Sequence, residues 1–256
     1  MSLIVQGFLW IFVPAHWTTS ATSAGIGNAL AQHLALSGLS LLVAGVIALP
    51  LGLYIGHTGK GRGVAIVSSN IARAIPTLGL LSILLLYLPD VPFLPSGYTP
   101  DIVVFALLAI PPLLAGSYAG LEAIDRQTID AARAIGMTEW QILTKVEIPL
   151  GIALIIGGIR SSSLQIVATV TIAPLFTQIT LGTFIADGLA QADYVKVVAG
   201  AILVAALALI IDGLFAIVQR FVVPRGVSRR PTKEKSTTAR GTALAAKTGT
   251  PIQEGN

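Results

Sequence analysis

Cysteine is absent from this sequence of 256 residues, and charged side chains are scarce. The absence of cysteine excludes a disulfide framework, a zinc–cysteine site, an iron–sulfur cluster and thiol catalysis. Charged residues make up 11% of the chain and hydrophobic residues 54%, whereas about a quarter of an average soluble domain is charged. Because so few charges cannot solvate the surface of a soluble domain, and because the apolar residues form long blocks, the sequence predicts an integral membrane protein.

Basic residues are missing from the first part of the chain, where Lys60 is the first to occur. A secretory signal needs a positively charged start, so we expect no cleaved leader here. The opening apolar run, residues 3–13, ends at Pro14 and is shorter than the ~20 residues that a helix needs to cross the ~30 Å hydrocarbon layer. We therefore expect residues 1–33 to form an extracytoplasmic or interfacial segment. The alternative is a short sixth span at residues 3–17.

Longer apolar blocks follow, and each is long enough to span a bilayer as a helix. They predict an all-α, polytopic membrane helix bundle with five core transmembrane helices, which occupies residues 34–222. One sizeable polar insertion, residues 122–149, separates the third and fourth blocks. A tail over residues 223–256 has almost nothing to bury, so we expect it to be a disordered cytoplasmic segment. The five blocks are residues 34–56, 64–88, 102–121, 150–172 and 197–218.

Lysine and arginine are distributed unevenly over the connections between these blocks. Of the 16 basic residues, 13 fall on one side, only Lys196 falls on the other, and Arg73 and Arg160 lie inside predicted spans. Cytoplasmic loops of membrane proteins carry the excess of basic residues. We therefore predict that residues 122–149 and the C-terminus are cytoplasmic, with the N-terminus outside. The net charge of +4 then reflects orientation and contact with anionic membrane lipid, and no nucleic acid is expected as a partner.

Glycine and proline are frequent within the predicted spans. Two pairs of glycines four residues apart, Gly52 with Gly56 and Gly116 with Gly120, allow helix backbones to approach closely. Prolines leave a carbonyl without its donor and kink a helix. One interpretation is that the helices of the bundle bend or tilt as the protein functions. The other is that transmembrane helices tolerate glycine and proline in any case. The prolines are Pro50, Pro76, Pro111 and Pro112.

The polar insertion carries the signals of two short helices in a compact helix-turn-helix. Asp125 is placed to cap the first helix, and Gly136 supplies the positive φ that a helix end favours. Thr138 with Gln141 three residues later predicts a capping box at the second helix, and Pro149 marks the entry to the next span. We expect the outer surface of this hairpin to fit a groove on another protein. That surface is predicted to present Ala131, Ala132, Gly136, Met137 and Trp140.

The same loop resembles a motif of a known family. Asp130-Ala131-Ala132, Gly136 six residues after the aspartate, and Val146-x-Ile148-Pro149 match the "EAA…G…I-x-L-P" loop of permease subunits of binding-protein-dependent ABC importers, with Asp130 in place of the glutamate. The resemblance implies a type I ABC importer permease fold. It also implies that the loop forms the coupling helices, which dock into the ATPase subunits. The alternative is an ordinary amphipathic surface hairpin. The residues assigned to the coupling loop are Asp125, Asp130, Ala131, Ala132, Gly136, Met137 and Pro149.

Motifs outside the loop are similar to those of the glycine betaine, choline and carnitine importers, which take up quaternary-amine osmoprotectants. Two stretches depart from that group: residues 177–182 keep only the final Leu-Gly of a glycine-rich segment, and Ala115 and Gly116 replace an Arg-Asn pair. The resemblance implies a quaternary amine as the solute, and another small solute such as an amino acid is the alternative. The motifs are Asn70-x-x-Arg73-x-Ile75-Pro76-Thr77, Pro112 with Tyr118-x-Gly120 and Asp125, and Gly158-Ile159-Arg160.

The resemblance also implies partners and a location. The partners are separate ABC ATPase subunits that use ATP and magnesium, an extracytoplasmic solute-binding protein, and a second permease in a homodimer or heterodimer. The location is the cell (inner) membrane of a bacterium or archaeon. The chain itself is predicted to be no enzyme and to hold no cofactor, because its only Gly-Lys pair, Gly59-Lys60, has Tyr54 and Gly61 where a phosphate loop needs glycine and a hydroxyl residue. The histidines, which are scattered and predict no metal site, are His16, His33 and His57.

Three charged residues, Arg73, Arg160 and Asp212, are predicted at membrane depth. Charged side chains are costly there, so we expect them to face the bundle, a cavity or one another. An ion-driven secondary transporter, a further alternative, predicts acidic residues within the spans, and Asp212 alone is available.

Polar residues follow Arg160 at helical spacing and give its helix a polar stripe. The stripe either lines the solute path or supplies hydrogen bonds between helices, and the sequence favours neither. The candidate translocation path consists of Arg73, Thr77, Arg160, Ser161, Gln165 and Thr169.

Overall fold

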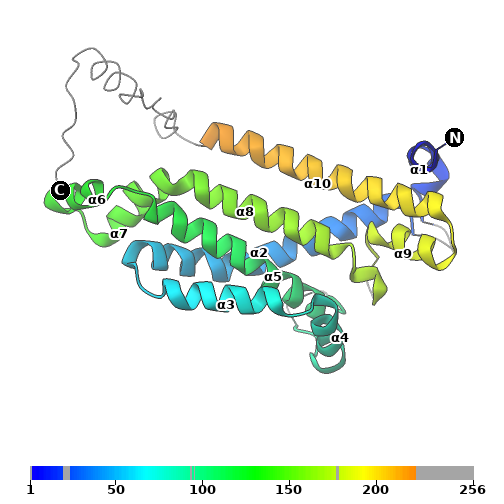
Figure 1. The fold of residues 1–256 in the computed structure, drawn as a ribbon, viewed down its shortest axis with the longest axis horizontal. Helices are drawn as coiled ribbons and strands as arrows, with labels where there is room; N and C mark the ends of the chain where they lie inside the picture. Colours follow the sequence, from blue (N-terminus) through cyan, green and yellow to red (C-terminus); the bar gives the residue numbers. More distant parts are fainter. Residues whose placement is uncertain (1, 20–23, 93, 95, 177–178, 223–256) are drawn as a thin grey trace, which may run out of the picture. The chain divides into compact units, whose positions relative to one another are not determined.

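The computed structural model describes residues 2–19, 24–92, 94, 96–176 and 179–222 (Figure 1). Over these ranges the chain is helical and contains no strand, which confirms the all-α prediction. The predicted disordered tail lies outside the described residues, as do Thr177 and Gln178 of the departing stretch.

Four helices in the described ranges are long and apolar enough to cross a membrane, and a fifth span exists if a bent pair of helices counts as one. This agrees with the predicted five core spans, although the boundaries differ. The first long helix already begins at Ile26, so the boundary predicted at residue 33 falls inside it. The four helices are α2 (Ile26–Thr58), α5 (Thr99–Glu122), α8 (Ile148–Val170) and α10 (Tyr194–Val222).

The second predicted span, residues 64–88, is not one continuous helix. Helix α3 (Arg62–Ala74) and helix α4 (Thr77–Tyr87) meet at an angle of 85°. A proline disfavours helical backbone in the residue before it and cannot donate to the helix ladder. Ile75 is accordingly extended, with φ −73° and ψ 126°, directly before Pro76. Neither helix alone reaches the ~20 residues that a span needs.

The hydrophobic core sits between α2, α5 and α8, and α5 packs extensively against both of the other helices. Each of these helices turns apolar side chains toward the other two, and their burial removes them from the surface of the bundle. Large buried side chains from all three helices include Leu36, Phe105, Leu113 and Ile166.

Glycines bring the backbones of these three helices close together. A Cβ atom on Gly116 of α5 would lie 2.5 Å from the Cα of Gly158 of α8. A Cβ atom on Gly52 of α2 would lie 2.5 Å from the Cβ of Ser117 of α5. Both distances are too short for real atoms, so the close approach that the glycine spacing predicted is confirmed. A Cβ would also lie closer than 3.0 Å to a neighbouring helix at Gly56, Gly120 and Gly151.

The N-terminal helix α1 (Leu3–Ile11) has nine residues, too few to cross a bilayer as a helix. It packs against α10, where a Cβ on Gly7 would meet Val198 at 2.7 Å. Its Trp10 ring also meets the ring of Phe184, with centroids 5.6 Å apart. Phe184 belongs to α9 (Gly182–Ala190), a helix that the sequence analysis did not predict.

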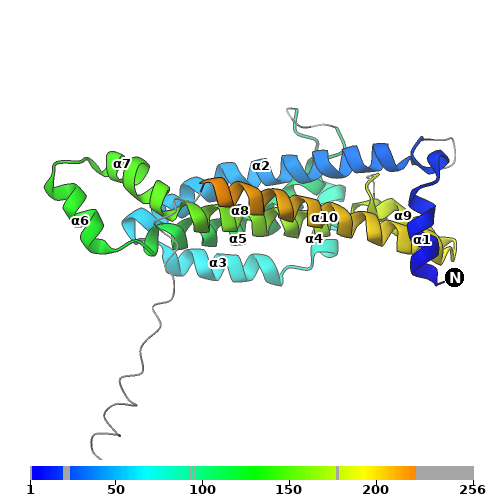
Figure 2. The same ribbon diagram turned by 90° about the horizontal axis from the view of Figure 1, so that it is seen from above.

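The connections that carry the basic residues gather at one end of the described bundle. The turn between α2 and α3, helices α6 (Arg126–Ala134) and α7 (Glu139–Ile142), and the last turn of α10 lie at that end in both views, whereas α1 and α9 lie at the other (Figures 1 and 2). Lys60 and Arg220 belong to the first end, and Lys196 belongs to the second. This arrangement agrees with the predicted orientation, in which the first end is cytoplasmic.

Candidate functional site

Helices α6 and α7 form the predicted hairpin, and local capping explains where each begins. The carboxylate of Asp125 accepts a hydrogen bond from the backbone N–H of Gln127 at 3.0 Å and caps α6. Thr138 and Gln141 form a reciprocal capping box at α7. Gly136, between the two helices, has φ +86°, a conformation that other L-residues adopt only at a cost. All three local predictions are confirmed.

The second helix of the hairpin does not stand alone. Helix α7 continues through η2 (Leu143–Glu147), a π-helical segment, directly into α8. The backbone N–H of Ile148 donates to the carbonyl of Leu143, five residues back. Pro149 comes next and has no N–H to donate to the carbonyl of Lys145, so the regular pattern of helical hydrogen bonds is interrupted at this point as well. The predicted second helix is therefore present as α7, but it was not predicted to continue without a break into a transmembrane helix.

Two residues of the predicted docking surface point inward. Ala132 is buried in a small cluster with Ile129 and Ile142, and Met137 packs against the same cluster. The outer surface instead exposes Ala131, Gly136, Ile135 and Trp140, and the last two are 79% and 72% exposed. Ile135 was not predicted to be part of this surface. The sequence signal for this residue would have been its position: an apolar residue directly before the glycine that ends the helix, where the hairpin offers no partner for its side chain.

An ion pair between charged side chains joins α6 to α7. Arg133 donates to both carboxylate oxygens of Glu139, from Nε at 2.8 Å and from Nη2 at 3.0 Å. It also reaches Asp130, the residue that replaces the motif glutamate, at 3.3 Å. Bidentate geometry fixes the orientation of two groups as well as attracting them. Asp130 is therefore an exposed part of the hairpin's internal charge pairing.

Arg160 and Asp212 meet inside the membrane-spanning part of the bundle. The guanidinium of Arg160 on α8 donates from Nε and Nη2 to the two carboxylate oxygens of Asp212 on α10, both at 2.6 Å. These residues were expected to face the bundle, a cavity or one another, and the structure shows that they face one another. Each charge thereby neutralises the other within the bilayer.

The rest of the polar stripe on α8 bonds mainly to helix backbone. Gln165 donates to the carbonyl of Leu108 on α5 at 3.1 Å, and Thr169 donates to the carbonyl of Gln165 in its own helix at 2.7 Å. Ser161 is exposed. Ser162, a buried neighbour that the stripe did not include, donates to the carbonyl of Ala109 at 2.9 Å. Of the two interpretations, hydrogen bonding between helices describes Gln165, whereas lining of the path stays a prediction for Ser161.

Arg73 and Thr77 lie on the two sides of the break between α3 and α4. Arg73 is exposed, and no carboxylate among the described residues pairs with it. Helix α3 buries only Ala65 within this chain. The structure therefore does not bring Arg73 and Arg160 together. Arg73 lies on a helix that is mostly exposed in this chain, whereas Arg160 is paired with Asp212 within the bundle.

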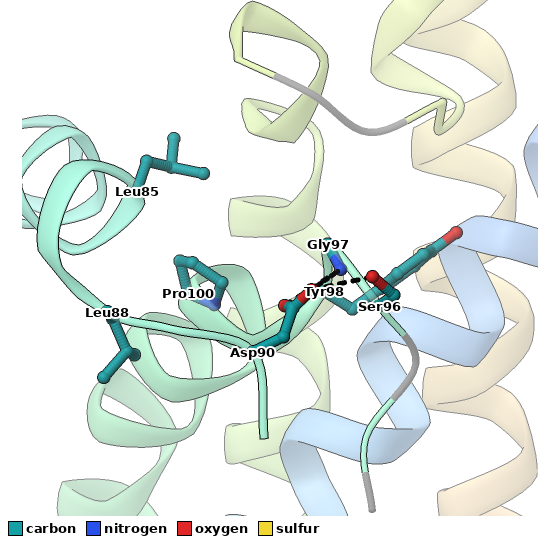
Figure 3. Close-up of a pocket in the computed structure, with 7 residues that line it drawn as sticks. All are labelled: Leu85, Leu88, Asp90, Ser96, Gly97, Tyr98 and Pro100. Atoms are coloured by element: carbon teal, nitrogen blue, oxygen red, sulfur yellow. Dashed lines mark hydrogen bonds between the residues drawn. The ribbon is translucent and has the colours of Figure 1, made fainter. Parts of the chain in front are cut away.

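A cavity of about 480 Å³ opens at the start of α5, at the end opposite the hairpin (Figure 3). Its polar wall is the carboxylate of Asp90, which accepts hydrogen bonds from the hydroxyl of Ser96 at 2.7 Å and from the N–H of Gly97 at 2.9 Å. These bonds, first that of Ser96 and then that of Gly97, hold the pKa of Asp90 below its ordinary value. Tyr98, also in the wall, donates its hydroxyl to Gln32 of α2 at 2.9 Å. The sequence offered no motif for this cavity.

These features define a polytopic membrane protein with a helical hairpin between two of its spans. Residues 48–224 match the family described as "Binding-protein-dependent transport system inner membrane component". The chain belongs to this family, which supplies the membrane permease of ABC importers, while the ATPase is a separate subunit. The protein is therefore not itself an enzyme, and the alternative of an ion-driven secondary transporter is set aside.

Curated relatives match most of the chain. The glycine betaine/carnitine/choline transport system permease protein OpuCB of Bacillus subtilis (strain 168) is 32% identical over 196 residues, which are 77% of this chain and 88% of the relative. The carnitine transport permease protein OpuCB of Listeria monocytogenes is 30% identical and covers 77% of this chain and 87% of its own. The osmoprotectant import permease protein OsmW of Salmonella typhimurium (strain LT2) is 27% identical and covers 77% and 91%.

Solved structures share the fold. The inward-facing MetNI methionine ABC transporter superposes with a TM-score of 0.66 at 22% identity, over 78% of this chain and 96% of that one. An amino acid ABC transporter with histidines superposes with a TM-score of 0.56 at 19% identity, over 77% and 91%. These likenesses support the type I ABC importer permease fold.

Proposed function

We propose that this permease imports a quaternary-amine osmoprotectant, such as glycine betaine, choline or carnitine, across the cell membrane of a bacterium or archaeon. ATP hydrolysis with magnesium in a separate ATPase drives the movement, and an extracytoplasmic binding protein delivers the solute. The observation that carries the proposal is the match over 77% of the chain to permeases named for these solutes.

The hairpin is the point at which the ATPase acts on this chain. Exposed Ile135 and Trp140 flank Gly136 and offer apolar side chains without a partner in the hairpin, the kind of surface that a groove on another protein covers. Because α7 runs without a break into η2 and α8, a displacement of the hairpin moves the transmembrane helix with it. The hairpin thereby converts closure of the ATPase subunits into movement within the membrane.

A second permease covers helix α3. Asn70 and Arg73 are exposed on this helix, and lipid chains cannot satisfy an amide or a guanidinium. A homodimer or heterodimer that places two α3 helices at a shared seam gives these side chains a water-filled path to face. Arg73 and Thr77, at the break between α3 and α4, then lie on the solute's route.

The pairing of Arg160 with Asp212 is compatible with a solute that carries a quaternary ammonium group. An unpaired arginine at membrane depth would repel a quaternary ammonium group, but both carboxylate oxygens of Asp212 bind this guanidinium at 2.6 Å. The pair carries no net charge, so it places no electrostatic barrier in the way of a cation.

Reconstitution into proteoliposomes with the cognate ATPase and binding protein tests the proposal. Uptake of radiolabelled glycine betaine, choline or carnitine is expected only with ATP inside and binding protein outside. Vesicles without ATP and vesicles without binding protein are the controls. Uptake of methionine or another amino acid, with none of the three quaternary amines, would contradict the solute class while leaving the ABC importer class intact.

A further inference from the structure

One carboxylate at the cytoplasmic end is almost completely buried. Glu147, the last residue of η2, is 3% exposed, and a buried carboxylate without a partner is strongly unfavourable. Its partner is His57 in the last turn of α2, whose Nδ1 lies 2.5 Å from Oε2 of Glu147. Residues 90 positions apart therefore join α2 to the helix that carries the hairpin.

The same imidazole reaches the start of the hairpin's second helix. Nε2 of His57 lies 3.3 Å from Oε2 of Glu139, the first residue of α7. Glu139 is in turn held by Arg133 of α6. His57 thus contacts carboxylates at both ends of the stretch that contains the π-helical turns, and through Glu139 it is linked to α6. π-Helical segments are rare and are enriched at functional sites, and the last residue of this one, Glu147, is bound by His57 of α2.

We infer that His57 is a positioning residue that makes the coupling hairpin and the cytoplasmic end of α2 move together. The inference rests on the proposed function, since it requires that an ATPase moves the hairpin. The unbroken helical stretch from α7 through η2 is sufficient to pass this movement to α8. The contacts of His57 pass it to α2 as well, and α2 is packed closely on α5 at Gly52 and Gly56. All three core helices then respond to one event.

The complete importer in proteoliposomes, with ATPase and binding protein, tests this role through the uptake of solute per ATP hydrolysed. His57→Ala is expected to lower that ratio about fivefold or more, the size of an ordinary coupling energy between sites. Glu147→Gln is expected to lower it similarly. The double variant is expected to be no worse than His57→Ala alone, because that change already removes the contact that Glu147→Gln alters.

Lys60→Ala is the matched control. Lys60 is exposed on the same connection three residues beyond His57, and its loss removes a positive charge without touching the hairpin. The ratio in this variant is expected to equal that of the wild type. A variant that affects only assembly would lower uptake and ATP hydrolysis in the same proportion.

A ratio unchanged in His57→Ala, or effects of His57→Ala and Glu147→Gln that simply add, would overturn the inference. Should His57→Ala fail to assemble, Glu147→Gln carries the test alone, and an unchanged ratio in that variant would overturn the inference as well. Failure of the proposed function can be told apart from failure of this inference, because the wild type itself would then import none of the three quaternary amines.

Discussion

Gln165 on α8 donates a hydrogen bond from Nε2 to the carbonyl oxygen of Leu108 on α5, across 3.1 Å. In a regular helix the backbone N–H four residues later would donate to this carbonyl, but that residue is Pro112, which has no N–H. The glutamine therefore supplies, from a neighbouring helix, the bond that the proline removes. Within a bilayer such replacement is required, because no water is present to satisfy the carbonyl.

Gln165→Leu is expected to destabilise the permease. The change leaves the carbonyl of Leu108 without a donor, and a loss of about 1 kcal/mol in the free energy of unfolding is typical of such bonds between transmembrane helices. Thermal unfolding in detergent measures the effect. Ser161→Ala, an exposed position on the same helix, is the control and should unfold like the wild type. Equal unfolding temperatures for Gln165→Leu and the wild type would show that the bond contributes nothing.

Asp212→Asn is expected to impair assembly, because it leaves the charge of Arg160 uncompensated within the membrane. The reversed pair, Arg160→Asp with Asp212→Arg, restores an anion beside a cation and is expected to recover much of the assembled protein. Yield by size-exclusion chromatography is the measurement. Asp187→Asn, which breaks the ion pair with Lys196 at 3.1 Å near the start of α10, is the control. A reversed pair that assembles no better than Asp212→Asn would contradict the pairing.

Local features of the hairpin could be predicted from the sequence because they depend on neighbouring residues. Asp125, Thr138 and Gly136 each act within three residues of their own position. The inward direction of Ala132 depends instead on Ile142 from the next helix. The π-helical turns before Pro149 have no signature in composition or spacing, so the continuity of α7 with α8 could not be predicted.

The long-range partners of Arg160 and Glu147 could not be predicted from the sequence for a different reason. The cost of a charge in lipid predicts that Arg160 has a partner or a cavity, but Asp212 is 52 residues away, and only the packing of α8 on α10 brings them together. The burial of Glu147 against His57 is likewise a consequence of how α2 meets η2. Hydropathy predicted the spans well, but it could not show that Pro76 breaks one of them by 85°.

Gly158→Ala is expected to destabilise the contact of α5 with α8. The added Cβ would lie 2.9 Å from the Cα of Gly116 and 3.0 Å from the carbonyl oxygen of Pro112. Both are backbone atoms, which can yield only if a helix shifts, so a loss of about 1–3 kcal/mol in stability follows. Gly157→Ala is the matched control, because a Cβ there meets no atom of another described element within 4 Å. Thermal unfolding of the two variants should differ clearly, and equal unfolding would contradict the close approach.

The loop around Asp90 is expected to lose its order only in acid. Because hydrogen bonds from Ser96 and then Gly97 lower the pKa of Asp90, folding favours the ionised carboxylate. The stabilisation is therefore complete above the ordinary carboxyl pKa of ~3.9 and is lost as the pH falls through the lowered value. Amide hydrogen exchange of Gly97 measures it. Asp90→Asn should speed this exchange at neutral pH, whereas Asp125→Asn, at the other end of the molecule, should not. Unchanged exchange in Asp90→Asn would contradict the role.

Gly136→Val is expected to uncouple ATP hydrolysis from uptake while leaving insertion into the membrane intact. Gly136 has φ +86°, where a β-branched residue is strained by about 1–2 kcal/mol. The hairpin can relieve the strain only by changing the angle between α6 and α7, which displaces Ile135 and Trp140 from the surface that meets the ATPase. Uptake and ATP hydrolysis in proteoliposomes are the measurements.

Gly136→Asn separates backbone conformation from bulk at the same position. Asparagine adopts positive φ more readily than valine. Among the described residues, the chain neighbours aside, no atom lies within 4 Å of a Cβ at Gly136, so the hairpin itself can accommodate the new side chain. If Gly136 acts through the hairpin's shape, Asn retains coupled uptake and Val loses it. Loss in both variants would instead place Gly136 in direct contact with the ATPase. Full uptake with valine would show that the angle of the hairpin does not matter for coupling.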